Sequence, residues 1–83
     1  MEDKSDKRYI TLRQMRSGQS GIVFEILGGH GLARRLSAMG IRPGKRITKV
    51  GSMFMRGPVT IQVDRAQFAI GYGMANRILV EVD

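Results

Sequence analysis

PVTIQVD, at residues 58–64, has the strictest alternation of apolar and polar residues in the chain. Successive side chains of a β-strand point to opposite faces, so this pattern predicts a strand with one face on a core. The inward face is predicted to consist of Val59, Ile61 and Val63. Residues 64–66 are predicted to turn the chain at the end of this strand.

Four further short strands are predicted on either side of this stretch, at residues 22–27, 45–53, 67–70 and 78–82. Turn-forming residues separate neighbouring strands, except that a helix is predicted between the first strand and the second. The second of the four contains Gly51, where we expect a β-bulge, and residues 54–57 connect it to PVTIQVD as a hairpin. Residues 71–77 are too rich in glycine for a strand, and we expect one helical turn there.

The first predicted strand also alternates between two faces. Ile22, Phe24 and Ile26 are expected on one face, with Val23, Glu25 and Leu27 on the other. Aromatic side chains bury a large apolar area, so Phe24 and Phe68 are assigned to the core.

Between the first two strands the apolar spacing changes to that of a helix. Leu32, Leu36 and Met39 are four and three residues apart, which places them on one helical face. Gly40 is expected to end this helix in a left-handed conformation, and the proline–glycine pair that follows prevents the helix from resuming. Thr11 is expected to cap a short turn nearer the start of the chain.

These elements predict a mainly β protein. Five short strands with tight turns, and one short α-helix after the first strand, fit a five-stranded SH3-like barrel better than a parallel sheet. The competing architecture is an OB-type barrel, whose strands are longer and whose helix lies later in the chain. Residues 1–8 are charged and polar, so we expect a disordered tail there, followed by one SH3-like domain at residues 9–83.

The composition excludes several classes of site. The 83-residue chain contains no cysteine, which removes disulfides, zinc ribbons, iron–sulfur clusters and thiol nucleophiles. No segment has the apolar core of a signal peptide or the roughly 20 apolar residues of a transmembrane helix, so we expect a cytoplasmic protein. The formal net charge of +7 indicates an anionic partner, but the basic residues are scattered, which is typical of a solubilising or steering field.

Nucleic acid is one candidate for such a partner. The chain shows no RNP, KH or helix-turn-helix signature. Single-strand binders stack bases on aromatic residues, and few of the two tyrosines and three phenylalanines stay free once the core is filled. We therefore expect no nucleic-acid partner, and a basic nucleic-acid-binding barrel is kept as an alternative.

No catalytic arrangement can be assembled from these residues. GIRPGKR, at residues 40–46, is one residue short of a Walker loop and ends in Arg46 where a hydroxyl is required. GHG, at residues 29–31, begins a dinucleotide fingerprint that has Arg34 where the last glycine belongs. We expect these glycines to serve turns. Since no serine lies in a nucleophile elbow and no carboxylates are paired, we expect a protein that is not an enzyme.

His30 is the only imidazole in the chain. A tight transition-metal site needs three or four ligands, so His30 is at most a weak ligand for Fe²⁺ or another divalent metal, with a carboxylate or across a dimer contact. The simpler interpretation is an exposed loop residue. No cofactor is expected to be required, and weak self-association is left open.

Met53, Phe54 and Met55 form a run of large apolar residues at a predicted hairpin tip. Because strand side chains alternate, at least one of the three is expected to be exposed, where it would form an adaptable docking surface. The alternative is a bulged strand that folds all three residues over the end of the barrel.

LARRLSAMGIRPG, at residues 32–44, resembles the signature of the FeoA family. GPVTIQV at 57–63, FAI at 68–70 and ANRILV at 75–80 follow in the order and spacing of that family. The resemblance extends over residues 9–82, and its central block is specific.

The resemblance implies an SH3-like barrel in a bacterial cytosol and a role in ferrous iron uptake through FeoB, the membrane GTPase permease. Such a partner would bring the protein to the inner membrane. The expected partner-binding residues are Arg34 and Arg35 on the helix, with Met53, Phe54 and Met55 at the hairpin tip. FeoA-like domains also occur as the C-terminal module of DtxR-type repressors, so a metal-binding sensor or carrier is the alternative function.

Overall fold

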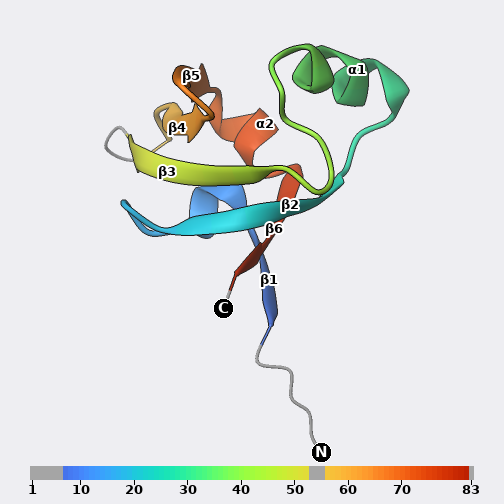
Figure 1. The fold of residues 1–83 in the computed structure, drawn as a ribbon. Coiled ribbons are helices and arrows are strands. Elements are labelled where there is room, and N and C mark those ends of the chain that lie inside the picture. The colour runs from blue at the N-terminus through green and yellow to red at the C-terminus, as the bar shows by residue number, and fades with distance from the viewer. Residues whose placement is uncertain (1–6, 53–55, 83) are drawn as a thin grey trace, which may run out of the picture.

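The computed structural model describes residues 7–52 and 56–82 (Figure 1). In chain order the elements are β1 (Arg8–Thr11), the 3₁₀ helix η1 (Leu12–Gln14), β2 (Ser20–Ile26), α1 (His30–Ala38), β3 (Arg46–Ser52), β4 (Val59–Val63), β5 (Ala66–Ile70), α2 (Tyr72–Ala75) and β6 (Ile78–Val82). Strands dominate this order, which confirms the mainly β class predicted from the alternation.

The strands form one antiparallel sheet in the order β1-β6-β2-β3-β4-β5. Figure 1 shows β2 and β3 lying side by side through the middle of the molecule, with α1 beyond one end of this pair. The connection from β2 through α1 to β3 therefore places the helix at a corner of the sheet, where it is close to the end of β2.

Local alternation predicts five strands, whereas the described residues form six. The additional strand is β1, which begins at Arg8 and pairs along β6, with Tyr9 opposite Glu81 and Thr11 opposite Leu79. Four residues are too few to show a period of two, and the partner strand lies at the other end of the sequence. Strand pairing over such a separation is decided by tertiary packing rather than by local pattern.

Strand β2 differs from its predicted pattern in two ways, a bulge and the choice of the buried face. The pairing of β2 with β6 shifts register between Val23 and Glu25. Val23 is only 1% exposed, whereas Phe24 is 49% exposed, so the assignment of Phe24 to the core is wrong. The bulge adds one residue to this strand and leaves Phe24 outside the ladder. A second irregularity lies between Lys49 and Gly51 in β3, which confirms the bulge predicted at Gly51.

One apolar core lies beneath the sheet and α1. The inward face predicted for β4 is confirmed, because all three of its apolar residues are at most 2% exposed. Leu36 is buried, while Leu32, Met39 and Phe68 are partly buried and pack against the core. The predicted apolar face of the helix is therefore confirmed. Gly40 has a φ of 86°, which is the left-handed conformation expected at the end of α1.

The turn after β1 is capped as predicted. The Thr11 hydroxyl oxygen accepts a hydrogen bond from the Gln14 main-chain N–H at 3.3 Å, and the Gln14 side-chain oxygen accepts one from the Thr11 N–H at 2.9 Å. This reciprocal pair is a capping box. It holds η1 so that Leu12 is fully buried.

Both α-helices are short. α1 has nine residues and α2 has four, and α2 confirms the single helical turn predicted within residues 71–77. Over the described ranges, no helix has the length and apolar character needed to cross a membrane.

Candidate functional site

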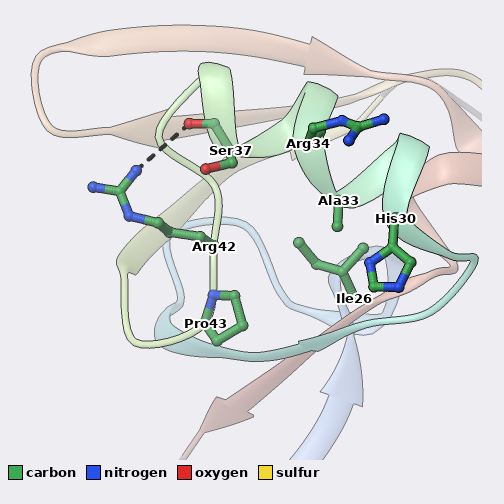
Figure 2. A pocket seen from close by; sticks show the side chains of 7 residues that line it. All are labelled: Ile26, His30, Ala33, Arg34, Ser37, Arg42 and Pro43. Atoms are coloured by element: carbon green, nitrogen blue, oxygen red, sulfur yellow. Dashed lines mark hydrogen bonds between the residues drawn. The ribbon is translucent and has the colours of Figure 1, made fainter.

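A hollow of about 350 Å³ lies between α1, the end of β2 and the turn that follows α1 (Figure 2). We call it the α1 hollow. Its lining residues are Ile26, His30, Ala33, Arg34, Ser37, Arg42 and Pro43. Binding pockets for small ligands range from roughly 300 to 1,000 Å³, so this hollow has room for one large side chain or a small ligand.

The residue spacing along α1 explains how the helix serves both the core and the hollow. Leu32 and Leu36 lie on the face that packs inward. The helical residues that line the hollow recur at intervals of three and four, so they share the other face. They are His30, Ala33, Arg34 and Ser37.

Arg42 reaches the hollow from the turn between Gly40 and Gly44. Both glycines have positive φ angles, 86° and 94°, as predicted for turn-forming glycines in this segment. The Gly44 N–H donates to the Val23 carbonyl at 2.8 Å, which holds the turn against β2. One guanidinium nitrogen of Arg42 donates a long hydrogen bond of 3.5 Å to the Ser37 carbonyl, shown dashed in Figure 2. The turn and the helix are thereby joined across the hollow.

The α1 hollow combines positive charge with an apolar surface. Figure 2 shows Ile26 and Ala33 pointing toward one another, with His30 beside Ile26. Arg34 and Arg42 contribute two guanidinium groups, and none of the seven lining residues is acidic. Guanidinium groups bind carboxylates and phosphates through paired hydrogen bonds. The hollow can therefore accept an apolar side chain that has a carboxylate or another anion next to it.

The structure separates the residues that the sequence singled out. Arg34 lines the α1 hollow, whereas Arg35 is exposed on the same helix and does not line it. Met53, Phe54 and Met55 lie outside the described residues, and their role stays a sequence prediction. Sequence reasoning missed Arg42 and Ile26. Arg42 follows Gly40 by two residues, within the turn that the sequence predicts after the helix. That predicted turn was the only sign that the Arg42 side chain would lie near α1.

His30 lies in this cationic hollow, at the start of α1. Within residues 7–52 and 56–82, no three His, Cys, Asp or Glu side chains come together as a group that could hold a metal ion. Figure 2 shows Arg42 on the opposite side of the hollow from His30. Weak metal binding at His30 stays a sequence prediction.

A second exposed feature lies on the outer side of the sheet. Tyr9 on β1 and Phe24 on β2 are each 49% exposed, and their ring centroids are 4.5 Å apart at an interplanar angle of 49°. Their strands flank β6 on its two sides. Aromatic pairs of this geometry stabilise each other while keeping apolar area available to a partner.

Comparison with known proteins gives consistent results. The sequence matches the model of the FeoA domain over residues 10–82. A protein of Methanocaldococcus jannaschii that has the provisional name Fe(2+) transport protein A is 36% identical over 66 residues, which are 80% of this chain and 78% of that protein.

Two solved structures support the same relationship. A crystal structure of an iron uptake regulatory protein, FeoA, is 41% identical with a TM-score of 0.80, covering 90% of this chain and 99% of that one. Stenotrophomonas maltophilia FeoA, solved with zinc and described as a prokaryotic SH3 domain protein, is 28% identical with a TM-score of 0.73, covering 86% and 88%. The SH3-like fold is therefore confirmed, and this chain belongs to the FeoA domain family.

Proposed function

We propose that this protein supports ferrous iron uptake by binding the cytosolic part of an FeoB-type membrane GTPase permease. The match to the FeoA domain family carries the proposal, and the M. jannaschii relative has a name that refers to Fe(2+) transport. Under this proposal the protein acts in the cytoplasm and reaches the inner membrane through its partner.

The α1 hollow is the structural feature that best supports a binding role. Its two arginines can pair with acidic groups of a partner, while Ile26 and Ala33 can cover an apolar side chain beside those groups. The net charge of +7 would attract an acidic partner surface and raise the rate of encounter. In this arrangement Arg34 and Arg42 set the orientation of the partner.

The proposal assigns no catalytic step and no resident cofactor to this chain. Ferrous iron is the cargo of the permease, and the regulated property is the activity or assembly of the permease.

The direct test is a binding measurement between the purified protein and the cytosolic domain of the permease. The double variant Arg34→Gln/Arg42→Gln removes two charges from the hollow, and Arg46→Gln/Arg65→Gln removes two exposed charges elsewhere. Charge-assisted hydrogen bonds contribute about 1.5–3 kcal/mol, so we expect the first variant to weaken binding by about tenfold or more. The control should lose affinity only slightly, through the weaker overall field.

Equal losses in both variants would show that the hollow is not the docking site. No binding of the wild-type protein to the permease domain would refute the proposed partnership. Equilibrium dialysis against Fe²⁺ without oxygen tests the sensor or carrier alternative, which requires one tightly bound ion per chain. A steep dependence of RNA or DNA affinity on salt concentration would favour the nucleic-acid alternative.

A further inference from the structure

Two arginines from distant parts of the chain lie over one tyrosine ring. The guanidinium carbon of Arg13 is 5.5 Å from the centroid of the Tyr72 ring, and that of Arg56 is 5.9 Å from it. Arg13 belongs to η1, Arg56 precedes β4, and Tyr72 begins α2. We call these three residues the Tyr72 cluster. It shares no residue with the α1 hollow.

Arg13 is held by hydrogen bonds at its side chain and at its main chain. Its Nε donates to the side-chain oxygen of Asn76 at 2.8 Å, and Asn76 caps the same helix that begins with Tyr72. Its main-chain carbonyl accepts a hydrogen bond of 2.9 Å from the ammonium group of Lys49. The terminal nitrogens of Arg13 make no hydrogen bond to any other described residue. The bond at Nε thus fixes the direction of the Arg13 side chain relative to α2.

The Tyr72 cluster holds two positive charges, and no ion pair among the described residues involves it. Among the described residues the ion pairs are Lys7 with Glu81 and Lys45 with Asp64, and neither involves the Tyr72 cluster. Lys49 lies against the Arg13 backbone, and after burial the charge of Arg13 is the second cause that lowers the pKa of Lys49. Like charges held together repel each other, and an anion bound at the guanidinium groups would reduce that repulsion.

Both guanidinium groups lie within cation–π distance of the same ring. Guanidinium groups also carry several N–H donors beyond the one that Arg13 Nε gives to Asn76. Those N–H groups form a fork that matches the oxygens of a carboxylate or a phosphate. One arginine satisfies a carboxylate, whereas two arginines match the larger number of oxygens and the double charge of a phosphate group.

We propose that the Tyr72 cluster is a binding site for a phosphate group, in which Arg13 and Arg56 contact the oxygens and Tyr72 holds both guanidinium groups in place. The site does not depend on the proposed permease partnership. The same chemistry is offered by free phosphate and by the headgroup phosphate of an acidic lipid, and the experiment distinguishes the two sources.

The first measurement is a titration of the full-length protein with inorganic phosphate, followed by two-dimensional NMR, against chloride at the same ionic strength. Saturable shifts are expected at Arg13, Arg56 and Tyr72. Arg56→Gln removes a side chain with no hydrogen bond to the described residues, so its effect on folding should be small. We expect it to weaken the association constant for phosphate by about tenfold, the effect of one charge-assisted hydrogen bond. Tyr72→Leu should weaken binding in the same direction because the guanidinium groups lose their support.

Arg65→Gln is the matched control, because it removes one charge from an exposed turn outside the cluster. Its phosphate affinity should stay within about twofold of the wild-type value, since only the general field changes. An equal loss in Arg65→Gln and Arg56→Gln would overturn the proposal. A circular dichroism melt of each variant shows whether the variant is folded.

The second measurement identifies the source of the phosphate group. Vesicles of phosphatidylcholine with and without phosphatidic acid are sedimented with the wild-type protein, Arg56→Gln and Arg65→Gln. Retention that requires phosphatidic acid and is lost only in Arg56→Gln assigns the site to a lipid headgroup. Binding of free phosphate without such retention assigns it to a soluble phosphate. Failure in both measurements overturns the proposal and leaves the permease partnership unaffected.

Discussion

The ammonium group of Lys49 is buried and donates a hydrogen bond of 2.6 Å to the main-chain carbonyl of Met15. It makes a second bond of 2.9 Å to the carbonyl of Arg13. Both carbonyls lie at the end of η1, where a helix leaves oxygens without partners. A positive group is favourable at such an end. Lys49 therefore ties β3 to the 3₁₀ helix and is part of the structural frame rather than of the solvated surface.

Lys49→Met is expected to lower the free energy of unfolding by about 1–3 kcal/mol. Methionine preserves much of the packing of the lysine stem, but the carbonyls of Arg13 and Met15 lose their donor. Urea denaturation measures the change. Lys45→Met is the control, because its ion pair with Asp64 is partly exposed and should contribute little. Equal stability of the Lys49→Met and wild-type proteins would contradict the structural role.

The stability difference between the wild-type protein and Lys49→Met should also depend on pH. Burial first, and then the charge of Arg13, lowers the pKa of Lys49 in the folded state below its ordinary value of 10.5. The unfolded chain therefore binds this proton more tightly, and wild-type stability relative to the variant rises as pH increases through the lowered pKa toward 10.5. Below the lowered pKa both states are protonated and the difference is constant. Denaturation at a series of pH values would show a flat difference if Lys49 did not titrate in this way.

Gly21→Ala is expected to destabilise the protein by about 1–3 kcal/mol, the usual cost of overpacking. A Cβ atom at Gly21 would lie 2.5 Å from a methyl carbon of Val80 and 2.8 Å from the carbonyl oxygen of Glu81. The oxygen belongs to the backbone of β6 and cannot move without disturbing the sheet. Gly31→Ala is the matched control, since its Cβ meets no atom within 4 Å and alanine favours the helix. Thermal melts should rank Gly31→Ala above the wild type and Gly21→Ala below it.

Val23→Ala should cost more stability than Phe24→Ala, although phenylalanine loses the larger side chain. Val23 is buried in the core, so its truncation is expected to cost about 2 kcal/mol. Phe24 is half exposed, and its replacement loses mainly the contact with Tyr9, worth about 1 kcal/mol. Chemical denaturation of the two variants compares these values. The opposite ranking would mean that Phe24, and not Val23, lies on the core face of β2.

Much of the fold could be predicted from local sequence. The alternation in β4, the helical spacing of Leu32 and Leu36, the turn at Gly40 and the cap at Thr11 all appear where their patterns predict them. Each of these elements is favoured by interactions within a few residues, and each presents its apolar side to the core without any irregularity. Local and global preferences agree there, so the pattern alone is sufficient.

The candidate site was only partly visible in the sequence. Arg34 stood out because it belongs to the stretch at residues 32–44 that resembles the FeoA signature, and it does line the α1 hollow. Arg42 and Ile26 join it there because the turn after α1 is bonded to β2 through Gly44 and Val23. The convergence of Arg13, Arg56 and Tyr72 likewise involves three segments that no local pattern connects.

Three features depend on contacts between distant segments: the strand β1, the outward turn of Phe24 and the burial of Lys49. β1 needs β6 as a partner, the face of β2 that carries Val23 rather than Phe24 packs against the core, and Lys49 is covered by η1. The periodicity of a sequence records which faces of an element are apolar. It does not record which segment will lie against each face, because that choice depends on the free energy of packing the whole chain.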